Sequence, residues 1–137
     1  MNSKYKKYID YIVNDIELPY LKYLEAYGLK DNEKEMILSK VFNQSVTIKG
    51  NWVYNTNGNE IYIETSDGNW IKYEYDTNGN LIYREDADGF WIKYEYDANG
   101  NKIYHEDSTG VWEKYEYDTN NNEIYYEDST GYIEDNR

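Results

Sequence analysis

The stretch that decides the fold runs from Tyr73 to Tyr94 and reads YEYDTNGNLIYREDADGFWIKY. Much of this pattern returns every 21 residues along positions 54–137, so that columns of Ile, Tyr and Trp line up. Self-similarity at a fixed period is typical of repeat architectures. The sequence therefore predicts four tandem 21-residue repeats, and these begin at Tyr54, Tyr75, Tyr96 and Tyr117.

Two turn signals divide each period. The first reads DTNG from Asp76 to Gly79, and the second reads DADG from Asp86 to Gly89. An Asp at the first position can cap the turn and a Gly at the fourth can adopt positive φ, which predicts a type I turn closed by a G1 bulge. In the last copy of the first signal Asn121 replaces Gly, and Asn tolerates the left-handed region well.

Strands that tight turns join are antiparallel neighbours. We therefore expect a meander of about nine strands from residue 45 to the C-terminus. Within the strand at 69–75, one face takes Trp70 and Glu74 while the other takes Ile71 and Tyr73, so neither face is purely polar. This pattern favours a single curved sheet that cross-strand aromatic and Lys–Glu pairs stabilise. The predicted class is α+β, with an N-terminal helical cap at 1–44 and an acidic β-hairpin repeat sheet at 45–137.

Residues 1–44 show helical spacing of their apolar side chains. A first helix is expected over residues 4–16, and its apolar positions are Tyr5, Tyr8, Ile9, Ile12, Val13 and Ile16. Pro19 is expected to open a second helix that Gly28 ends. Its apolar side comprises Tyr20, Leu21, Leu24 and Tyr27. Asp31 is the expected N-cap of a third helix, and the apolar residues of that helix are Met36, Ile37 and Val41.

These helices are open to two interpretations. They either cap the first edge of the sheet, which would block aggregation through that edge, or form a docking surface for a partner.

The acidic charge is concentrated in the repeats. Residues 1–49 carry eight basic and seven acidic side chains, whereas residues 50–137 carry six basic and twenty acidic ones, a balance of −14. Such a field repels nucleic acid and attracts basic surfaces. Direct binding of DNA or RNA is therefore not expected. The alternative is that the acidity only keeps an aromatic-rich open sheet in solution.

The sequence offers little catalytic or metal-binding chemistry. It has no cysteine, and its one histidine, His105, falls in a column that varies freely, as expected of a surface residue. The turn that begins at Asp76 resembles the start of an EF-hand loop, but Gly79 and Ala87 occupy the wrong positions for calcium. We predict no catalytic residue, metal ligand or cofactor. No apolar run predicts a signal peptide or a membrane span, so a cytoplasmic location without a membrane partner is expected.

The segment from Tyr94 to Gly110, YEYDANGNKIYHEDSTG, resembles the YD-repeat (Rhs-type) family. The family core, Tyr-x-Tyr-Asp-x-x-Gly-Asn, is matched at 73–80 and 94–101 and, with Asn for Gly, at 115–122. The resemblance covers residues 54–137 and implies a β-hairpin scaffold, which in that family forms shells or stalks of large secreted or surface proteins. Because this chain is much shorter and more acidic, only the hairpin geometry carries over.

The sequence predicts a non-enzymatic protein-binding module whose acidic surface blocks a basic nucleic-acid-binding surface of a partner, such as a nuclease or effector complex. In size and charge it is similar to phage-encoded anti-defence inhibitors, including anti-CRISPR proteins, which would act in the cytoplasm of the host cell. The alternatives are a structural repeat protein of a larger assembly and a glycan-binding module. The residues expected to contact the partner are Glu64, Glu74, Glu85, Glu95, Glu106, Glu116 and Glu127, together with Trp70, Trp91 and Trp112.

Overall fold

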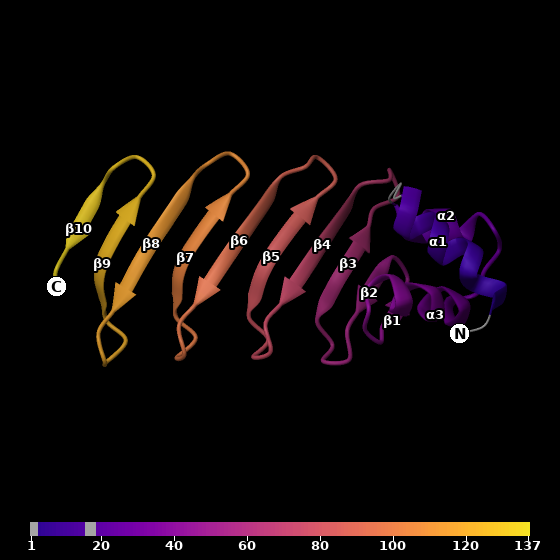
Figure 1. Ribbon diagram of the computed structural model, residues 1–137, viewed down its shortest axis with the longest axis horizontal. Helices are drawn as coiled ribbons and strands as arrows, with labels where there is room; N and C mark the ends of the chain where they lie inside the picture. The colour runs from indigo at the N-terminus through magenta and orange to yellow at the C-terminus, as the bar shows by residue number, and fades with distance from the viewer. Residues whose placement is uncertain (1–2, 16–18) are drawn as a thin grey trace. The chain divides into compact units, whose positions relative to one another are not determined.

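The structure, a computed structural model, describes residues 3–15 and 19–137 (Figure 1). Within these residues, the helices are α1 (Lys6–Asp15, after a 3-10 turn at Ser3–Tyr5), α2 (Tyr20–Glu25) and α3 (Asp31–Val41). The strands are β1 (Thr47–Lys49), β2 (Trp52–Tyr54), β3 (Glu60–Glu64), β4 (Trp70–Tyr75), β5 (Leu81–Asp86), β6 (Trp91–Tyr96), β7 (Lys102–Asp107), β8 (Trp112–Tyr117), β9 (Glu123–Asp128) and β10 (Ile133–Asp135).

The strands form one antiparallel meander in chain order, and the sheet does not close on itself. The α+β class and the meander are thus confirmed, although the described residues contain ten strands rather than nine. The additional strand arises because β1 and β2 form a short hairpin that turns at Gly50, where φ is 61°, before the repeats begin.

Internal contacts divide the chain into a unit that ends at Ile71 and a unit from Lys72 to Arg137. The expected division fell after residue 44, but the first three strands belong with the helices, which pack on them. We call the two parts the N-terminal unit and the C-terminal unit and describe each separately.

The N-terminal unit holds most of the buried apolar side chains. The helices contribute Tyr5, Tyr8, Ile12, Tyr20, Leu21, Leu24, Ile37 and Leu38. On the strands, Ile48 pairs with Val53 and Val53 with Tyr62, so these three buried side chains share one face. The rings of Tyr20 and Tyr62 lie 5.1 Å apart and join the helices to that face.

Several helix predictions were correct and others need correction. Tyr5, Tyr8 and Ile12 are buried, and Gly28 follows α2 with φ of 71°. Val13, Tyr27 and Met36, which were expected on apolar faces, are about half exposed. In α3 the buried pair is Ile37 and Leu38, which turns Met36 toward solvent. Ile16 lies outside the described residues.

The start of α3 also differs from the prediction. Asp31 is the first residue of the helix, and Lys30 occupies the N-cap position. The carboxylate of Glu33 reaches back and accepts a hydrogen bond from the Lys30 backbone N–H at 3.1 Å. A side chain three residues into the helix therefore does the capping that was assigned to Asp31.

Side chains of α3 also accept hydrogen bonds from backbone N–H groups at the first edge of the sheet. The Ile48 N–H donates to Glu35 Oε2 at 2.7 Å, and the Val46 N–H donates to Ser39 Oγ at 3.2 Å. Unpaired edge amides are templates for unwanted strand pairing. The contacts from α3 thus remove donors from the β1 edge.

The turns of the C-terminal unit follow the predicted geometry. In the turn between β4 and β5, Asp76 Oδ1 accepts hydrogen bonds from the N–H groups of Asn78 and Asn80, both at 2.9 Å. Gly79 has φ of 84°, and its counterpart Asn121 has φ of 65°. The Asp carboxylate at the start of this turn thus accepts hydrogen bonds from backbone N–H groups, as the turn prediction requires.

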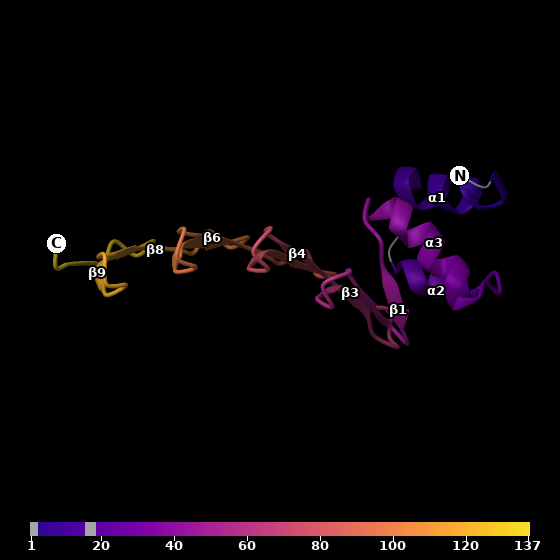
Figure 2. The same ribbon diagram turned by 90° about the horizontal axis from the view of Figure 1, so that it is seen from below.

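The C-terminal unit is a single layer with two open faces. Viewed edge-on in Figure 2, its strands have no other element stacked on them. Tyr125, at 9 % exposure, is its one buried hydrophobic side chain. Contacts between neighbouring strands take the place of a core: the Tyr96 hydroxyl of β6 donates to the Leu81 carbonyl of β5 at 2.7 Å, and the Tyr117 hydroxyl of β8 donates to the Lys102 carbonyl of β7 at 2.9 Å.

Candidate partner-binding face

Strand pairing brings the expected Glu and Trp columns onto one face of the C-terminal unit. Side chains alternate along a strand, so Trp91, Lys93 and Glu95 share a face of β6. Lys93 pairs across to Tyr83 of β5 and to Glu106 of β7. We call this surface the Trp–Glu face; its residues in β5–β9 are Tyr83, Glu85, Trp91, Lys93, Glu95, Tyr104, Glu106, Trp112, Lys114, Glu116, Tyr125 and Glu127.

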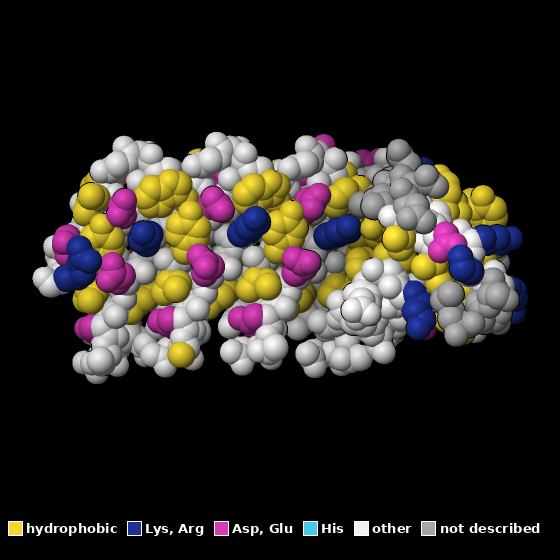
Figure 3. All heavy atoms as spheres, viewed as in Figure 1, with side chains coloured by type: hydrophobic (Ala, Val, Ile, Leu, Met, Phe, Trp, Pro, Cys, Tyr) yellow, Lys and Arg dark blue, Asp and Glu magenta, His cyan; other side chains and the backbone are white. Residues whose placement is uncertain are grey.

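The Trp–Glu face has a regular order of rows. In Figure 3, lysines lie between two rows of acidic side chains, and hydrophobic side chains lie among these charged groups. Each repeat advances by two strands about 4.8 Å apart and is offset by two residues along the strand, so equivalent residues lie about 12 Å apart. With one Lys and two Glu per repeat, this face carries one net negative charge in each.

The tryptophans pack within this surface. The Trp91 ring stacks on Tyr83 with centroids 6.5 Å apart, and Lys93 Nζ lies 4.8 Å from the Trp91 ring. Trp112 stacks on Tyr104 in the same way at 6.4 Å. Trp70 lies on the side of β4 that Lys72 and Glu74 also occupy, by strand alternation. Trp91 and Trp112 are thus part of the cross-strand ladder rather than free platforms.

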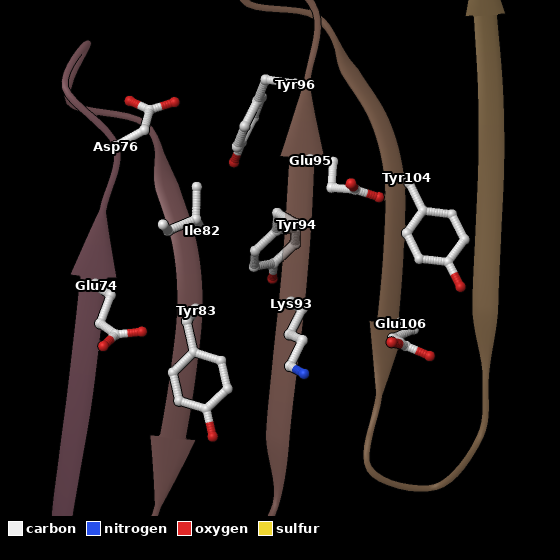
Figure 4. A pocket seen from close by; sticks show the side chains of 10 residues that line it. All are labelled: Glu74, Asp76, Ile82, Tyr83, Lys93, Tyr94, Glu95, Tyr96, Tyr104 and Glu106. Atoms are coloured by element: carbon white, nitrogen blue, oxygen red, sulfur yellow. The ribbon is translucent and has the colours of Figure 1, made fainter.

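Two hollows open on the C-terminal unit, one repeat apart. The first measures about 640 Å³, and Figure 4 shows its lining residues: Glu74, Asp76, Ile82, Tyr83, Lys93, Tyr94, Glu95, Tyr96, Tyr104 and Glu106. The second measures about 580 Å³, and its lining residues are Glu95, Asp97, Ile103, Tyr104, Lys114, Tyr115, Glu116 and Tyr117. Across the described residues, the Glu95 and Glu106 carboxylates form no hydrogen bond or salt bridge.

Glu64 differs from the other glutamates of its column, because it is only 8 % exposed. Its Oε1 accepts hydrogen bonds from the Leu21 N–H at 2.6 Å and from the Tyr62 hydroxyl at 2.7 Å, and its Oε2 accepts one from the Lys22 N–H at 3.1 Å. Burial raises the pKa of the Glu64 carboxyl, and these hydrogen bonds oppose that rise. Glu64 therefore binds the start of α2 and lies out of reach of a partner.

The contact between Tyr and Glu in Tyr62-x-Glu64 returns in the C-terminal unit. The Tyr83 hydroxyl donates to Glu85 Oε1 at 2.9 Å, and the Tyr125 hydroxyl donates to Glu127 Oε1 at 2.7 Å. Burial, and then the hydrogen bond to Glu85, raise the pKa of Tyr83 to about 12. The phenol therefore stays protonated at neutral pH and holds the carboxylate in place.

Glu116, near the C-terminal edge, already has a partner within the chain. Arg137 Nη1 lies 3.3 Å from Glu116 Oε2, and the Arg137 guanidinium stacks on the Tyr125 ring at 4.1 Å. In the middle of the Trp–Glu face, by contrast, Glu95 of β6 and Glu106 of β7 have no such partner among the described residues.

The opposite face of the C-terminal unit carries His105. Its side chain is 14 % exposed and lies between the Tyr94 ring, 6.0 Å away, and Glu113, whose Oε1 is 3.7 Å from the imidazole Nε2. The expectation of a surface histidine was therefore wrong, because aromatic cross-strand packing covers the ring. In the part of the chain that the structure describes, no group of three or more His, Cys, Asp or Glu side chains could hold a metal ion.

Sequence reasoning did not include the tyrosines of the Trp–Glu face among the contact residues, and it assigned the lysines only to Lys–Glu pairs that stabilise the sheet. Tyr83 and Tyr104 line the first hollow, and Lys93 lies between them. The available signal was the spacing of two residues between Tyr83 and Glu85 and between Trp91 and Lys93, because such residues share a face of a strand.

A scan against protein-family models finds none that matches this chain, and a search of curated proteins also finds no match. The resemblance of residues 54–137 to YD repeats therefore stays a prediction. Among the described helices, none combines the length and the apolar character needed to cross a membrane.

Proposed function

We propose that this chain is a non-enzymatic protein-binding module that holds a basic protein partner on its Trp–Glu face. The observation that supports this most is the first hollow, in which the carboxylates of Glu95 and Glu106 adjoin the rings of Tyr83 and Tyr104. Aromatic side chains supply contact area at protein interfaces, and the carboxylates favour cationic groups.

The charge of the C-terminal unit supports the same choice of partner. Residues 72–137 hold seventeen acidic and six basic side chains, a net charge of −11. A field of this sign speeds association with a positively charged surface and repels nucleic acid. In the cell, the proposed targets are basic nucleic-acid-binding surfaces of nucleases or effector complexes, as for a phage-type anti-defence inhibitor in the cytoplasm of the host.

The proposed attraction relies on charge complementarity rather than on a copy of nucleic-acid spacing. Equivalent carboxylates recur about every 12 Å along the face, whereas a DNA strand carries one phosphate per about 3.4 Å of helix axis. In this proposal, the four 21-residue repeats are equivalent parts of one curved sheet. Glycan binding receives less support, because Tyr83 and Lys93 already pack on the Trp91 ring.

The proposal is tested by fluorescence anisotropy with a labelled helical peptide of Ala and Lys, and with a matched peptide of Ala and Glu. The double variant Glu95→Lys/Glu106→Lys changes the Trp–Glu face. The control Asp88→Lys/Glu134→Lys makes the same change in net charge at a turn and at the β10 edge.

Of the two peptides, we expect only the Ala–Lys peptide to bind. Its affinity should fall as ionic strength rises from about 0.01 to 0.15 M, because the screening length falls from about 30 to 8 Å. The face variant should lose roughly tenfold in affinity, since exposed ion pairs contribute about 0.2–1 kcal/mol each. The control should lose clearly less. Equal losses in the two double variants, or binding that ignores salt, would refute the proposed face.

A further inference from the structure

The N-terminal unit shows what one Tyr-x-Glu pair binds. The first backbone N–H groups of a helix have no partner within the helix. In α2, the Tyr20 N–H donates to the Tyr62 hydroxyl at 3.1 Å, and the next two N–H groups, of Leu21 and Lys22, donate to the Glu64 carboxylate. The pair thus holds three successive backbone donors at the start of a helix.

Further copies of the pair are open in the C-terminal unit. Tyr83 and Glu85 make the same internal hydrogen bond as Tyr62 and Glu64, at 2.9 Å instead of 2.7 Å. Among the described residues, no backbone N–H donates to the side chain of Glu85. Its second carboxylate oxygen therefore remains available to a donor from another molecule, and Tyr104-x-Glu106 repeats the spacing one period later.

A neighbouring column indicates what kind of helix an open pair would accept. Val53 is fully buried beneath the helices, and the residues one, two and three periods later are Glu74, Glu95 and Glu116. This column is apolar where the chain's own helices cover it and acidic where no element does. A helix on the open copies would therefore find a carboxylate at the position that Val53 has in the N-terminal unit, and a basic side chain would complement it.

We infer that Tyr83-x-Glu85 and Tyr104-x-Glu106 are docking points for the first turn of a basic α-helix of a partner protein. The free N–H groups of that turn donate to the Glu carboxylate, and an aromatic residue at the helix start packs on the Tyr ring, as Tyr20 packs on Tyr62. Basic side chains further along the helix face the Glu95 column. This inference rests on the proposed function and adds the structural class of the partner.

The test uses a synthetic helical peptide that begins with Pro-Tyr-Leu, the sequence of the α2 N-cap Pro19 and the first two helix residues, and continues with Ala and Lys. In the control peptide, esters replace the two amides whose N–H groups correspond to those of Leu21 and Lys22. An ester removes the donor and keeps the charge and the shape. Hydrogen bonds to charged acceptors are among the stronger ones, so the control should bind at least about tenfold more weakly to the full-length protein.

A protein variant identifies the acceptor. Glu85→Gln/Glu106→Gln should weaken the amide peptide more than the ester peptide, because both peptides lose the charge attraction but only the amide peptide also loses its N–H hydrogen bonds to the carboxylates. Glu74→Gln/Glu95→Gln, the control with the same change in net charge, should weaken both peptides by the same factor. Far-ultraviolet circular dichroism verifies that each variant is folded.

The outcomes separate the inference from the proposed function. If the amide and ester peptides bind equally but with strong salt dependence, the docking points are refuted and the basic-partner proposal stands. If neither basic peptide binds at low salt, the proposed function fails together with the inference.

Discussion

Replacing Glu64 by Ala should destabilise the N-terminal unit far more than the same change does one repeat later. The carboxylate is 8 % exposed and accepts hydrogen bonds from two backbone N–H groups of α2 and from the Tyr62 hydroxyl. Leaving a buried donor unsatisfied costs about 1–3 kcal/mol, and loss of a helix cap costs about 0.5–2 kcal/mol. We therefore expect Glu64→Ala to lower the free energy of unfolding by about 3 kcal/mol.

The matched control is Glu85→Ala. Glu85 occupies the equivalent position, but its one hydrogen bond comes from the Tyr83 hydroxyl, and water can replace it. Surface changes of this kind usually stay within about 0.5 kcal/mol.

Urea unfolding, followed through the helical circular-dichroism signal, reports on the unit that contains all the described helices. With a slope of about 1–3 kcal/mol per molar urea, the midpoint should fall by more than about 1 M for Glu64→Ala and hardly move for the control. Similar midpoints for the two variants would refute the role assigned to Glu64.

Three further predictions concern the C-terminal unit. Hydrogen bonds within the turn lower the pKa of Asp97 below 3.8, and the largest contribution comes from the Asn101 backbone N–H. The stability that these hydrogen bonds provide is present above pH 3.8 and is lost as pH falls through the lowered pKa. Thermal unfolding followed by near-ultraviolet dichroism should therefore show an acid loss that Asp97→Asn reduces, and an unchanged loss would contradict this. Gly100 has φ of 84°, so Gly100→Ala should lower the free energy of unfolding in urea by about 1 kcal/mol, and Gly100→Asn should lower it less. Equal losses for the two variants would contradict the claim that positive φ at this position is what disfavours Ala. Deleting one period, residues 75–95, should leave a folded protein with aromatic dichroism, because repeats depend mainly on their neighbours, and global unfolding would contradict an open meander.

Much of the C-terminal unit could be predicted from sequence because its signals are local. The Asp76–Gly79 turn signal and the spacing of six or seven residues between turns determine which strands pair. Alternation then places Trp91 and Glu95 on one face. The offset between repeats was not predicted, since it depends on where the bulges fall, such as the register shift between Glu95 and Tyr96.

The N-terminal unit was harder to predict because its contacts are distant in sequence. The repeat column grouped Glu64 with exposed glutamates, and nothing local indicated that α2, about forty residues earlier, would cover it. In the helices, the buried positions depend on which side meets β1–β3. Met36 and Val13 fit a helical period and nevertheless face solvent.

The most direct test of the central claim is hydroxyl-radical footprinting of side chains, with and without the basic helical peptide. This method reports which side chains a ligand covers, and the two faces of the C-terminal unit carry different reactive residues. Binding to the Trp–Glu face predicts protection of Tyr83, Tyr104 and Trp112, with His105 and Tyr126 on the opposite face unchanged. Protection of His105 and Tyr126, or protection confined to the helices, would contradict the account.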